Sequence, residues 1–249
     1  MPCNFLLNVL NRLSHHVSDA LTSRTPEELL FEGTVMVVGV GGVGSWAAIA
    51  AAMVMYDGKI ILVDNDQLEM SNVNRLPVPA IYAYRSVLKA YAVGDVLRML
   101  RPNIEVVEEV TMIGRGGILE NLLDKYSPDV VIDAVDNEYA SAALRAACRR
   151  RGIVMIRAKY DGFHYTFEYI ADWGAYGEGW GDAEAGGYTT VPSTPVVPLY
   201  LASLTALFLS ARPATNYYEY GDLSEKLPPD KAREVAEAME MKRRELNDQ

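Results

Sequence analysis

The chain has 249 residues, enough for one large α/β domain or two small ones with a buried core. Its formal net charge of −10 argues against a large nucleic-acid-binding surface, because phosphate binding depends on clustered basic side chains. The two cysteines, Cys3 and Cys148, exclude a disulfide framework and a four-thiolate zinc site, so we expect a cytoplasmic protein without zinc.

The first 30 residues have the pattern of one or two helices. Thr25 precedes a Pro-Glu-Glu sequence, which is typical of a helix N-terminus with Thr25 as its cap. The apolar residues here occur in patches, without the charged start and long apolar core of a signal peptide. We therefore expect residues 1–30 to form an N-terminal helical extension.

Strand and helix patterns alternate through residues 31–212, which we expect to form one domain. The predicted strands are 34–38, 59–63, 104–110, 130–135, 153–158 and 164–170, and the predicted helices are 44–56, 86–100, 117–125, 138–150 and 198–211. Continuous Val and Ile runs favour parallel strands covered on both faces. The alternation therefore predicts an α/β fold with a doubly wound, Rossmann-like, mostly parallel sheet. The longest apolar runs, 45–56 and 196–209, are shorter than the ~20 residues of a membrane span, so we expect no membrane association.

The alternation ends after residue 212, and residues 213–249 are expected to form a charged C-terminal tail. Asp230 is the expected cap of a final helix that runs to about Leu246. Residues 173–187 are predicted to form a long loop. The surrounding segment 161–190 contains six acidic residues and no Lys or Arg, which is typical of either a solvated loop or a surface for a basic partner.

A glycine-rich loop separates the first predicted strand from the first long helix, with Gly39, Gly41, Gly42 and Gly44. Glycine permits positive φ and lets backbone N–H groups approach a phosphate, and the helix N-terminus adds a favourable dipole. Asp64 ends the next strand, 20 residues after Gly44, where a carboxylate can bond a ribose hydroxyl. These features alone fit any dinucleotide-binding domain, including that of an NAD-dependent oxidoreductase.

The polar residues that follow argue against NAD. They are Asp64, Asp66, Asn72 and Arg75 in the run "VDNDQLEMSNVNR", then Lys89, then Asp133, Asp136 and Asn137 at the end of the fourth strand. Hydride transfer does not need this set, whereas the charge on a triphosphate must be neutralised during reaction. Asp136 follows a strand beside the expected cleft, where it could hold Mg²⁺.

Together these motifs resemble the ThiF/MoeB/HesA family of ubiquitin-activating-enzyme-like adenylyltransferases. The resemblance covers about residues 32–212 and rests on "GVGGVGS", "VDNDQLEMSNVNR", Lys89, "DAVDN" and the apolar helix after "VPSTPVVP". It implies ATP, Mg²⁺, a homodimer, and attack by a carboxylate on the α-phosphate to give an acyl-adenylate and pyrophosphate. The expected substrate is the C-terminus of a ubiquitin-like or sulfur-carrier protein.

The resemblance also implies a role for each matching residue. The nucleotide-binding set comprises Gly39, Gly41, Gly42, Gly44, Asp64 at the ribose, Asp66, Asn72 and Arg75 at the phosphates, and Lys89 at the α-phosphate. Catalysis is assigned to Arg75, Lys89, Asp136 and an arginine from a second subunit, for which Arg12 is the best match and Arg24 the alternative. Structural alternatives stay open: Lys89 could lie on a solvated helix face, and Asp136 could cap the following helix.

The sequence departs from the family pattern at several positions. Leu76 replaces a usual Gln, Ser86 replaces a usual Gly, paired zinc-binding cysteines are absent, and no cysteine lies in 171–197. Cys148 falls in a helix pattern and is expected to be buried and inert. Two other functions therefore remain open. One is that of the related tRNA threonylcarbamoyladenosine dehydratases, and the other is that of a relative that binds nucleotide or a partner without turnover.

Overall fold

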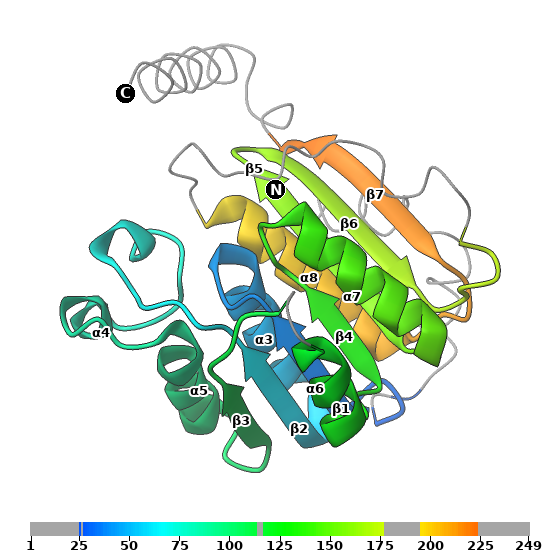
Figure 1. Ribbon diagram of the computed structural model, residues 1–249, viewed down its shortest axis with the longest axis horizontal. Coiled ribbons are helices and arrows are strands. Elements are labelled where there is room, and N and C mark those ends of the chain that lie inside the picture. Colours follow the sequence, from blue (N-terminus) through cyan, green and yellow to red (C-terminus); the bar gives the residue numbers. More distant parts are fainter. Residues whose placement is uncertain (1–24, 26, 114–116, 177–194, 224–249) are drawn as a thin grey trace.

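The computed structural model describes residues 25, 27–113, 117–176 and 195–223, and these contain a seven-stranded sheet (Figure 1). In chain order the strands are β1 (Phe31–Val38), β2 (Met55–Val63), β3 (Glu105–Glu109), β4 (Val130–Asp133), β5 (Val154–Asp161), β6 (His164–Ile170) and β7 (Tyr217–Asp222). Their spatial order is β3-β2-β1-β4-β5-β6-β7. Strands β1 to β5 pair in parallel, whereas β6 and β7 are antiparallel additions.

Helices cover both faces of this sheet, as the alternating pattern predicts. They are α3 (Gly42–Val54), α4 (Ala80–Tyr84), α5 (Lys89–Leu100), α6 (Ile118–Tyr126), α7 (Glu138–Arg151) and α8 (Val196–Ala211), with a short 3₁₀ turn, η1 (Met70–Asn72). Residues of α3, α5 and α8 share one apolar core with the sheet, and residues of α6 and α7 share another. The predicted doubly wound α/β fold is confirmed. Among the described helices, none is long and apolar enough to cross a membrane.

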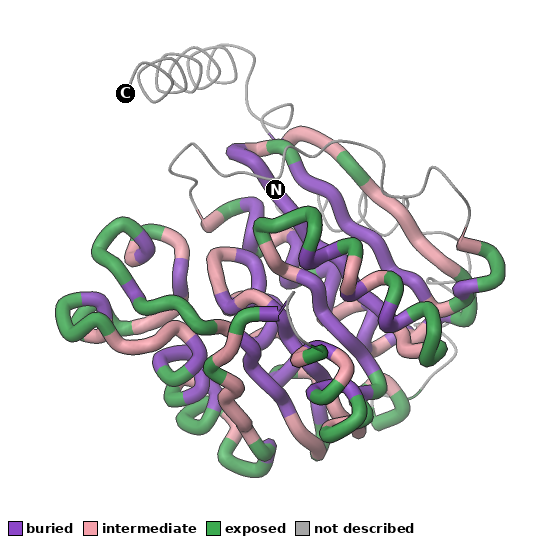
Figure 2. The backbone as a smooth tube through the Cα atoms, viewed as in Figure 1, coloured by how far each residue is buried: buried purple, intermediate pink, exposed green. Residues whose placement is uncertain are grey.

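The last four residues of β1 and of β2 are apolar because both faces of the sheet are covered there. Val35 and Val37 of β1 face the core with α3 and α8, while Met36 and Val38 face the core with α6 and α7. All four are at most 1% exposed. Figure 2 shows the same distribution, with the buried class concentrated along the inner strands. This double burial explains the continuous Val and Ile runs.

The largest boundary error lies between the first helix and the second strand. Helix α3 ends at Val54 and Met55 already belongs to β2, where it pairs with Phe31. The strand pattern was hidden because Gly33 and Gly58 lie opposite each other in register, both at positive φ. A side chain on Gly58 would collide with the Gly33 backbone, so neither position can show the alternation of an ordinary strand.

The predicted helix 86–100 is also wrong at its start. A separate helix, α4, ends at Tyr84, and Ser86 has φ +49°, in the left-handed region that favours glycine. Ser86 thus keeps the backbone conformation that suits the usual glycine at this position. The break makes Lys89 the first residue of α5.

The structure adds a strand, β7, to a segment that the sequence assigned to the tail. Strand β7 pairs with β6, and its Glu219 accepts hydrogen bonds from Tyr165 and Tyr200, each at 2.7 Å. A carboxylate on this inner face hid the usual alternation of a half-buried strand. The expected final helix capped by Asp230 lies outside the described residues.

Most of the predicted N-terminal extension lies outside the described residues, including Cys3, Arg12 and Arg24. At its end, the Thr25 N–H donates to Glu28 Oε2 at 2.8 Å, and the Glu28 N–H donates to Thr25 Oγ1 at 3.3 Å. These reciprocal bonds form a capping box, but residues 27–29 continue as a turn and not as a helix.

Candidate nucleotide-binding site

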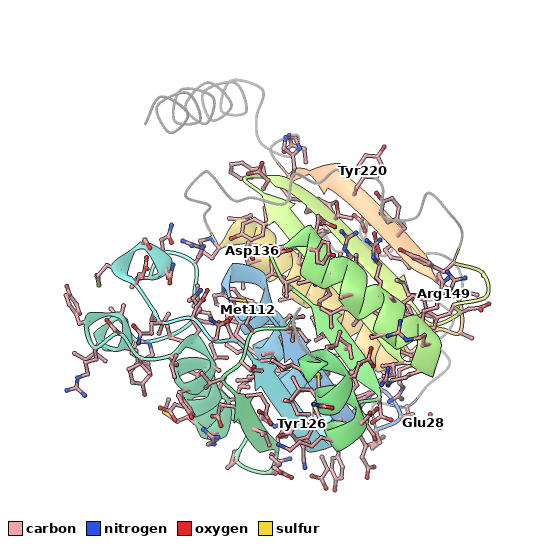
Figure 3. All side chains as sticks on the ribbon, viewed as in Figure 1. Glu28, Met112, Tyr126, Asp136, Arg149 and Tyr220 are labelled. Atoms are coloured by element: carbon pink, nitrogen blue, oxygen red, sulfur yellow. The ribbon has the colours of Figure 1, made fainter. Side chains whose placement is uncertain are left out.

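A cavity of about 300 Å³ lies at the carboxyl ends of the parallel strands. Its lining comes from the loops after β1, β2, β3 and β4, from residues 158–160 of β5, and from Arg75 and Lys89. Strand order reverses between β1 and β4, which is the position where ligands bind in open α/β sheets. Figure 3 labels Met112 and Asp136, which line the cavity from the loops after β3 and β4.

The glycine loop divides into packing and cavity-facing positions. Gly39 has φ +84°, and a Cβ on it would lie 2.6 Å from the Ala134 carbonyl oxygen, while a Cβ on Gly44 would collide with Gly39. Gly41 and Gly42 line the cavity, and a Cβ on Gly41 would meet no atom within 4 Å. Gly39 lines it too, whereas Gly44 does not join the described lining.

The N-terminus of α3 is well suited to an anion. Its N-cap is Gly41, no side chain bonds to the cap position, and no acidic residue occupies the described first turn. The first N–H groups of a helix have no intrahelical acceptor, and the helix dipole places positive partial charge at them. A phosphate at this end of the cavity would supply the missing acceptors.

Asp64 connects the end of β2 to the glycine loop. Its Oδ2 accepts from the Val40 N–H at 2.7 Å, and its Oδ1 accepts from the Asp66 N–H at 2.8 Å. Burial raises the pKa of Asp64 above its usual value, although these two bonds and the Lys89 charge oppose the rise. Asp64 lines the cavity, as its predicted contact with a ribose requires.

Lys89 and Asp66 form an ion pair in the cavity wall. Lys89 Nζ lies 2.8 Å from Asp66 Oδ2, and the Lys89 N–H donates to the Asp66 carbonyl at 2.8 Å. The Lys89 side chain is 15% exposed. The alternative of a solvated helix face is therefore wrong, and Lys89 stands where a phosphate could draw its ammonium away from Asp66.

Arg75 reaches the cavity from the loop after η1. Its Nη1 donates to the Ser71 carbonyl at 2.6 Å and to Asn74 Oδ1 at 3.1 Å. The Arg75 carbonyl accepts from Trp46 Nε1 at 2.8 Å, which ties this loop to α3. Arg75 Cδ would lie 3.3 Å from a Cβ on Gly42, so its side chain passes directly beside the glycine loop.

Asn72 is the predicted phosphate contact that the described structure does not bring to the cavity. Its side chain is buried, and its Oδ1 accepts from the Glu69 N–H at 3.1 Å within η1. The sequence pattern did not distinguish a ligand contact from a turn-stabilising amide, because both favour Asn in a loop. Asn72 stabilises the turn that leads to Arg75.

Asp136 lies at the exposed end of β4 and lines the cavity. The cap of α7 is the next residue, Asn137, whose Oδ1 accepts from Tyr139 N at 2.8 Å and from Ala140 N at 3.2 Å. The alternative that Asp136 caps this helix is therefore wrong. Among the described residues no three His, Cys, Asp or Glu side chains form a metal-binding group. One carboxylate with substrate phosphates and water is nevertheless a usual environment for Mg²⁺.

Sequence reasoning missed the cavity wall formed by β5. Lys159 and Tyr160 both line the cavity, and the Tyr160 hydroxyl lies 2.5 Å from a Cβ built on Gly42. The expected strand stopped at residue 158, whereas β5 continues to Asp161. The alternation of charges in Arg157, Lys159 and Asp161 was the available signal, since it places three charged residues on one face of a strand.

Cys148 is buried in α7, as expected. Burial raises the pKa of its thiol to about 12, and the negative charge of Asp133 adds to the rise. A neutral thiol is a poor nucleophile, so this cysteine is not suited to a thioester. The expectation of a second-subunit arginine stays a prediction, because Arg12 and Arg24 lie outside the described residues.

Comparison with known proteins agrees with this geometry. The chain is 33% identical over 129 residues to the tRNA threonylcarbamoyladenosine dehydratase of Escherichia coli, covering 52% of this chain and 47% of the relative. It is 32% identical over 142 residues to ubiquitin-like modifier-activating enzyme 5 of Branchiostoma floridae, covering 53% of this chain and 34% of the relative. The chain thus spans about half or less of these relatives' lengths.

The fold is also similar to a solved structure of Escherichia coli MccB with ATP, with a TM-score of 0.60 and 18% identity over 79% of this chain and 65% of that one. The model of the ThiF family, whose enzymes are ATP-dependent adenylyltransferases, matches residues 16–174, more than half of the sequence. With its glycine loop at the end of β1 and its mostly parallel sheet, the chain belongs to the ThiF family.

Proposed function

We propose that this protein is an ATP-dependent adenylyltransferase that activates the C-terminal carboxylate of a ubiquitin-like or sulfur-carrier protein. The observation that carries the proposal is the meeting of an uncapped helix N-terminus with Arg75, Lys89 and Asp136 around one cavity. Hydride transfer to or from a dinucleotide does not need two side-chain cations and a carboxylate at the phosphates. A triphosphate that loses pyrophosphate does, because charge builds on the leaving oxygens.

In this reaction an oxygen of the carboxylate bonds to the α-phosphorus of ATP. The bond from that phosphorus to the bridging oxygen breaks, and pyrophosphate leaves with the electron pair. The protein orients the reactants and neutralises charge: Asp64 holds the ribose, and Arg75 and Lys89 contact the phosphates. Asp136 would hold a Mg²⁺ ion, which supplies further neutralisation of the phosphate oxygens.

The departures at Leu76 and Ser86 leave the cavity intact. Leu76 is 5% exposed and packs with Leu68, Ala83 and Ala92 in a small apolar cluster, so its side chain stabilises the lobe that presents Arg75. Ser86 keeps the left-handed backbone before α5. The intact cavity supports a catalytic protein over a relative that binds nucleotide or a partner without turnover.

The similarity to ubiquitin-like modifier-activating enzyme 5 favours a protein as the carboxylate substrate. A tRNA substrate is the second candidate, because of the similarity to the tRNA threonylcarbamoyladenosine dehydratase. The net charge of −10 disfavours the tRNA, whose phosphates would be repelled. We therefore place the protein substrate first.

Calorimetry with ATP and Mg²⁺, and separately with NAD, tests the nucleotide. We expect ATP binding and no measurable NAD binding. Pyrophosphate–ATP exchange then tests the reaction, with candidate carrier proteins compared against unmodified and threonylcarbamoylated tRNA. Exchange that depends on tRNA alone would replace the first candidate by the second, and binding of NAD without ATP would overturn both.

A further inference from the structure

A group of charged side chains, buried except for Glu138, lies at the β5 side of the cavity on β4, β5, β6 and α7. Its members are Asp133, Glu138, Arg157, Lys159 and Glu168. Arg157 Nη2 donates to both carboxylate oxygens of Glu138, at 2.9 and 3.0 Å, and its Nη1 donates to Glu168 Oε1 at 3.0 Å. Lys159 Nζ donates to Glu138 Oε1.

Lys159 is the cation of this group that reaches the cavity lining in the described structure. Its side chain is 6% exposed, although a lysine is rarely buried without a specific partner. Glu138 is 54% exposed by comparison, so the partner that holds Lys159 stands at the protein surface. The ammonium is therefore kept at the cavity wall by a group that can exchange partners with solvent.

Lys159 and Lys89 enter the cavity from different parts of the sheet. Lys89 pairs with Asp66 just after β2, while Lys159 lies on β5, and the strand order between them is β2-β1-β4-β5. Three strand spacings amount to about 14 Å. The cavity thus has cations at both ends, with the glycine loop and Asp136 between them.

The chemistry assigns different partners to the two ends. In displacement at phosphorus the attacking and leaving oxygens lie roughly in line, on opposite sides. Lys89 stands beside Asp64 and Asp66 at the β2 end, and Arg75 passes beside Gly42, so the nucleotide takes the β2 end and the glycine loop. The β5 end, where Lys159 lines the cavity, is then left for the attacking carboxylate.

Resting on the function proposed above, we propose that Lys159 binds the attacking carboxylate at the C-terminus of the protein substrate, and that Glu138 occupies that position until the substrate arrives. Glu138 is itself a carboxylate bound by Lys159, so the group it stands in for has the same chemistry. When Lys159 turns to the substrate, Glu138 keeps its two bonds from Arg157. Both carboxylates then have a countercharge, so the exchange costs little free energy.

The test measures pyrophosphate–ATP exchange with a synthetic decapeptide ending in two glycines, so that no side chain limits access, and with the same peptide as its C-terminal amide. Lys159→Met removes the charge at similar length, and Lys159→Arg restores it. Glu138→Gln removes the negative charge of the carboxylate that competes with the peptide for Lys159. Lys59→Met is the matched control, because Lys59 also lies on a strand and pairs with a glutamate, Glu105, but lies outside the cavity lining.

We expect Lys159→Met to raise KM for the peptide acid about tenfold or more, since a charge-assisted bond is lost, while KM for ATP stays within about twofold. Lys159→Arg should recover much of the loss, and Glu138→Gln should lower KM for the peptide. A purely structural role would make Glu138→Gln harmful in the same direction as Lys159→Met, and that result would overturn the proposal.

Three other results would also count against it: an unchanged peptide KM in Lys159→Met, a raised KM for ATP instead, or exchange with the amide as strong as with the acid. Lack of exchange with the acid by an enzyme that binds ATP would exclude a peptide carboxylate. ATP calorimetry on each variant separates these failures from that of the proposed function, which fails if the wild-type protein does not bind ATP.

Discussion

The charged side chains at the two ends of the cavity are held by different kinds of interaction. At the β2 end and the adjoining glycine loop, Asp64 and Arg75 bond mainly to backbone groups, and Lys89 pairs with the exposed Asp66. At the β5 end, Lys159 belongs to a buried group that crosses several strands and a helix. The β2 end consists of loops whose charged groups are partly exposed, whereas the β5 end is a network of mostly buried charges.

The difference has consequences for what a substitution does. Removing a side chain at the β2 end should change ligand binding or rate and leave the fold intact. Removing a charge at the β5 end should reduce stability, because the remaining charges lose a partner in a medium of low polarity. Each of the following experiments compares the two ends, in order of decreasing effect.

Replacement of Arg157 by Met should have the largest effect. Arg157 is 3% exposed and pairs with Glu138 and Glu168, so its loss should lower the free energy of unfolding by about 3–5 kcal/mol. Arg150→Met is the control, since Arg150 pairs with Glu120 with side chains 59% and 38% exposed, and should cost about 1 kcal/mol or less. Urea denaturation measures both.

The Arg157→Met loss should also depend on pH. Burial raises the pKa of Glu168, and the Arg157 charge opposes that rise, so the variant should raise the pKa further. A carboxyl whose folded pKa exceeds its unfolded pKa destabilises the fold at high pH and ceases to do so when protonated. The loss should therefore be smaller at pH 5 than at pH 8. Equal losses of unfolding free energy at pH 5 and pH 8 would show that the charge of Glu168 is not the cause of the destabilisation.

Lys89→Ala tests the β2 end. We expect exchange to slow by about 10²–10³-fold, as for other lost charge-stabilising donors, while the urea midpoint stays near that of the wild type. Single-turnover measurement of adenylate formation at saturating ATP separates rate from affinity. A variant that loses stability as Arg157→Met does would show that the two ends are not built differently.

Trp46→Phe should have a smaller effect on the same end. It removes the bond from the indole N–H to the Arg75 carbonyl, which we expect to cost about 1 kcal/mol of stability and to weaken ATP binding slightly. Trp173→Phe is the matched control, because Trp173 Nε1 donates to the Ile153 carbonyl at 2.8 Å, away from the cavity. ATP affinity that falls equally in both variants would argue against a positioning role for Trp46.

The smallest expected effect concerns Cys148, behind the β5 end. With its pKa raised to about 12 by burial, the thiol should not react with iodoacetamide at pH 8 in the native Cys3→Ser protein, and should react after denaturation. Mass spectrometry counts the added groups. Stoichiometric alkylation of the native protein with loss of exchange would contradict the inert, structural role.

Much of the site could be predicted because its residues follow strands in short loops. Gly41, Asp64, Lys89 and Asp136 each come soon after a β-strand or begin a helix, and all four line the cavity. Parallel strands bring their carboxyl ends to one edge of the sheet, so residues far apart in sequence meet there whatever the details of packing. The fold class followed from the same alternation of strands and helices.

Other features were decided by contacts between distant segments. Local pattern favoured Asn72 as a ligand contact, but its amide is used within η1. Strand β7 escaped notice because Glu219 lies on an inner face, where only Tyr165 and Tyr200 from other elements make a carboxylate acceptable. In both cases the hydrogen-bond partner that decides the role of the residue is set by the three-dimensional course of the backbone. The periodicity of the sequence does not reveal that course.

Lys159 shows most clearly which part of the site the sequence alone does not predict. In sequence it is one lysine in a strand, with no spacing that relates it to the glycine loop. Its position at the cavity depends on β5 lying beside β4 and on Glu138 at the start of α7 reaching its ammonium. The sequence by itself determined the ends of β1 and β2, the glycine loop and the β2 side of the site, because these depend on short-range pattern. Only the tertiary structure decided the β5 side, because a buried charge is tolerated solely where distant segments supply its partners.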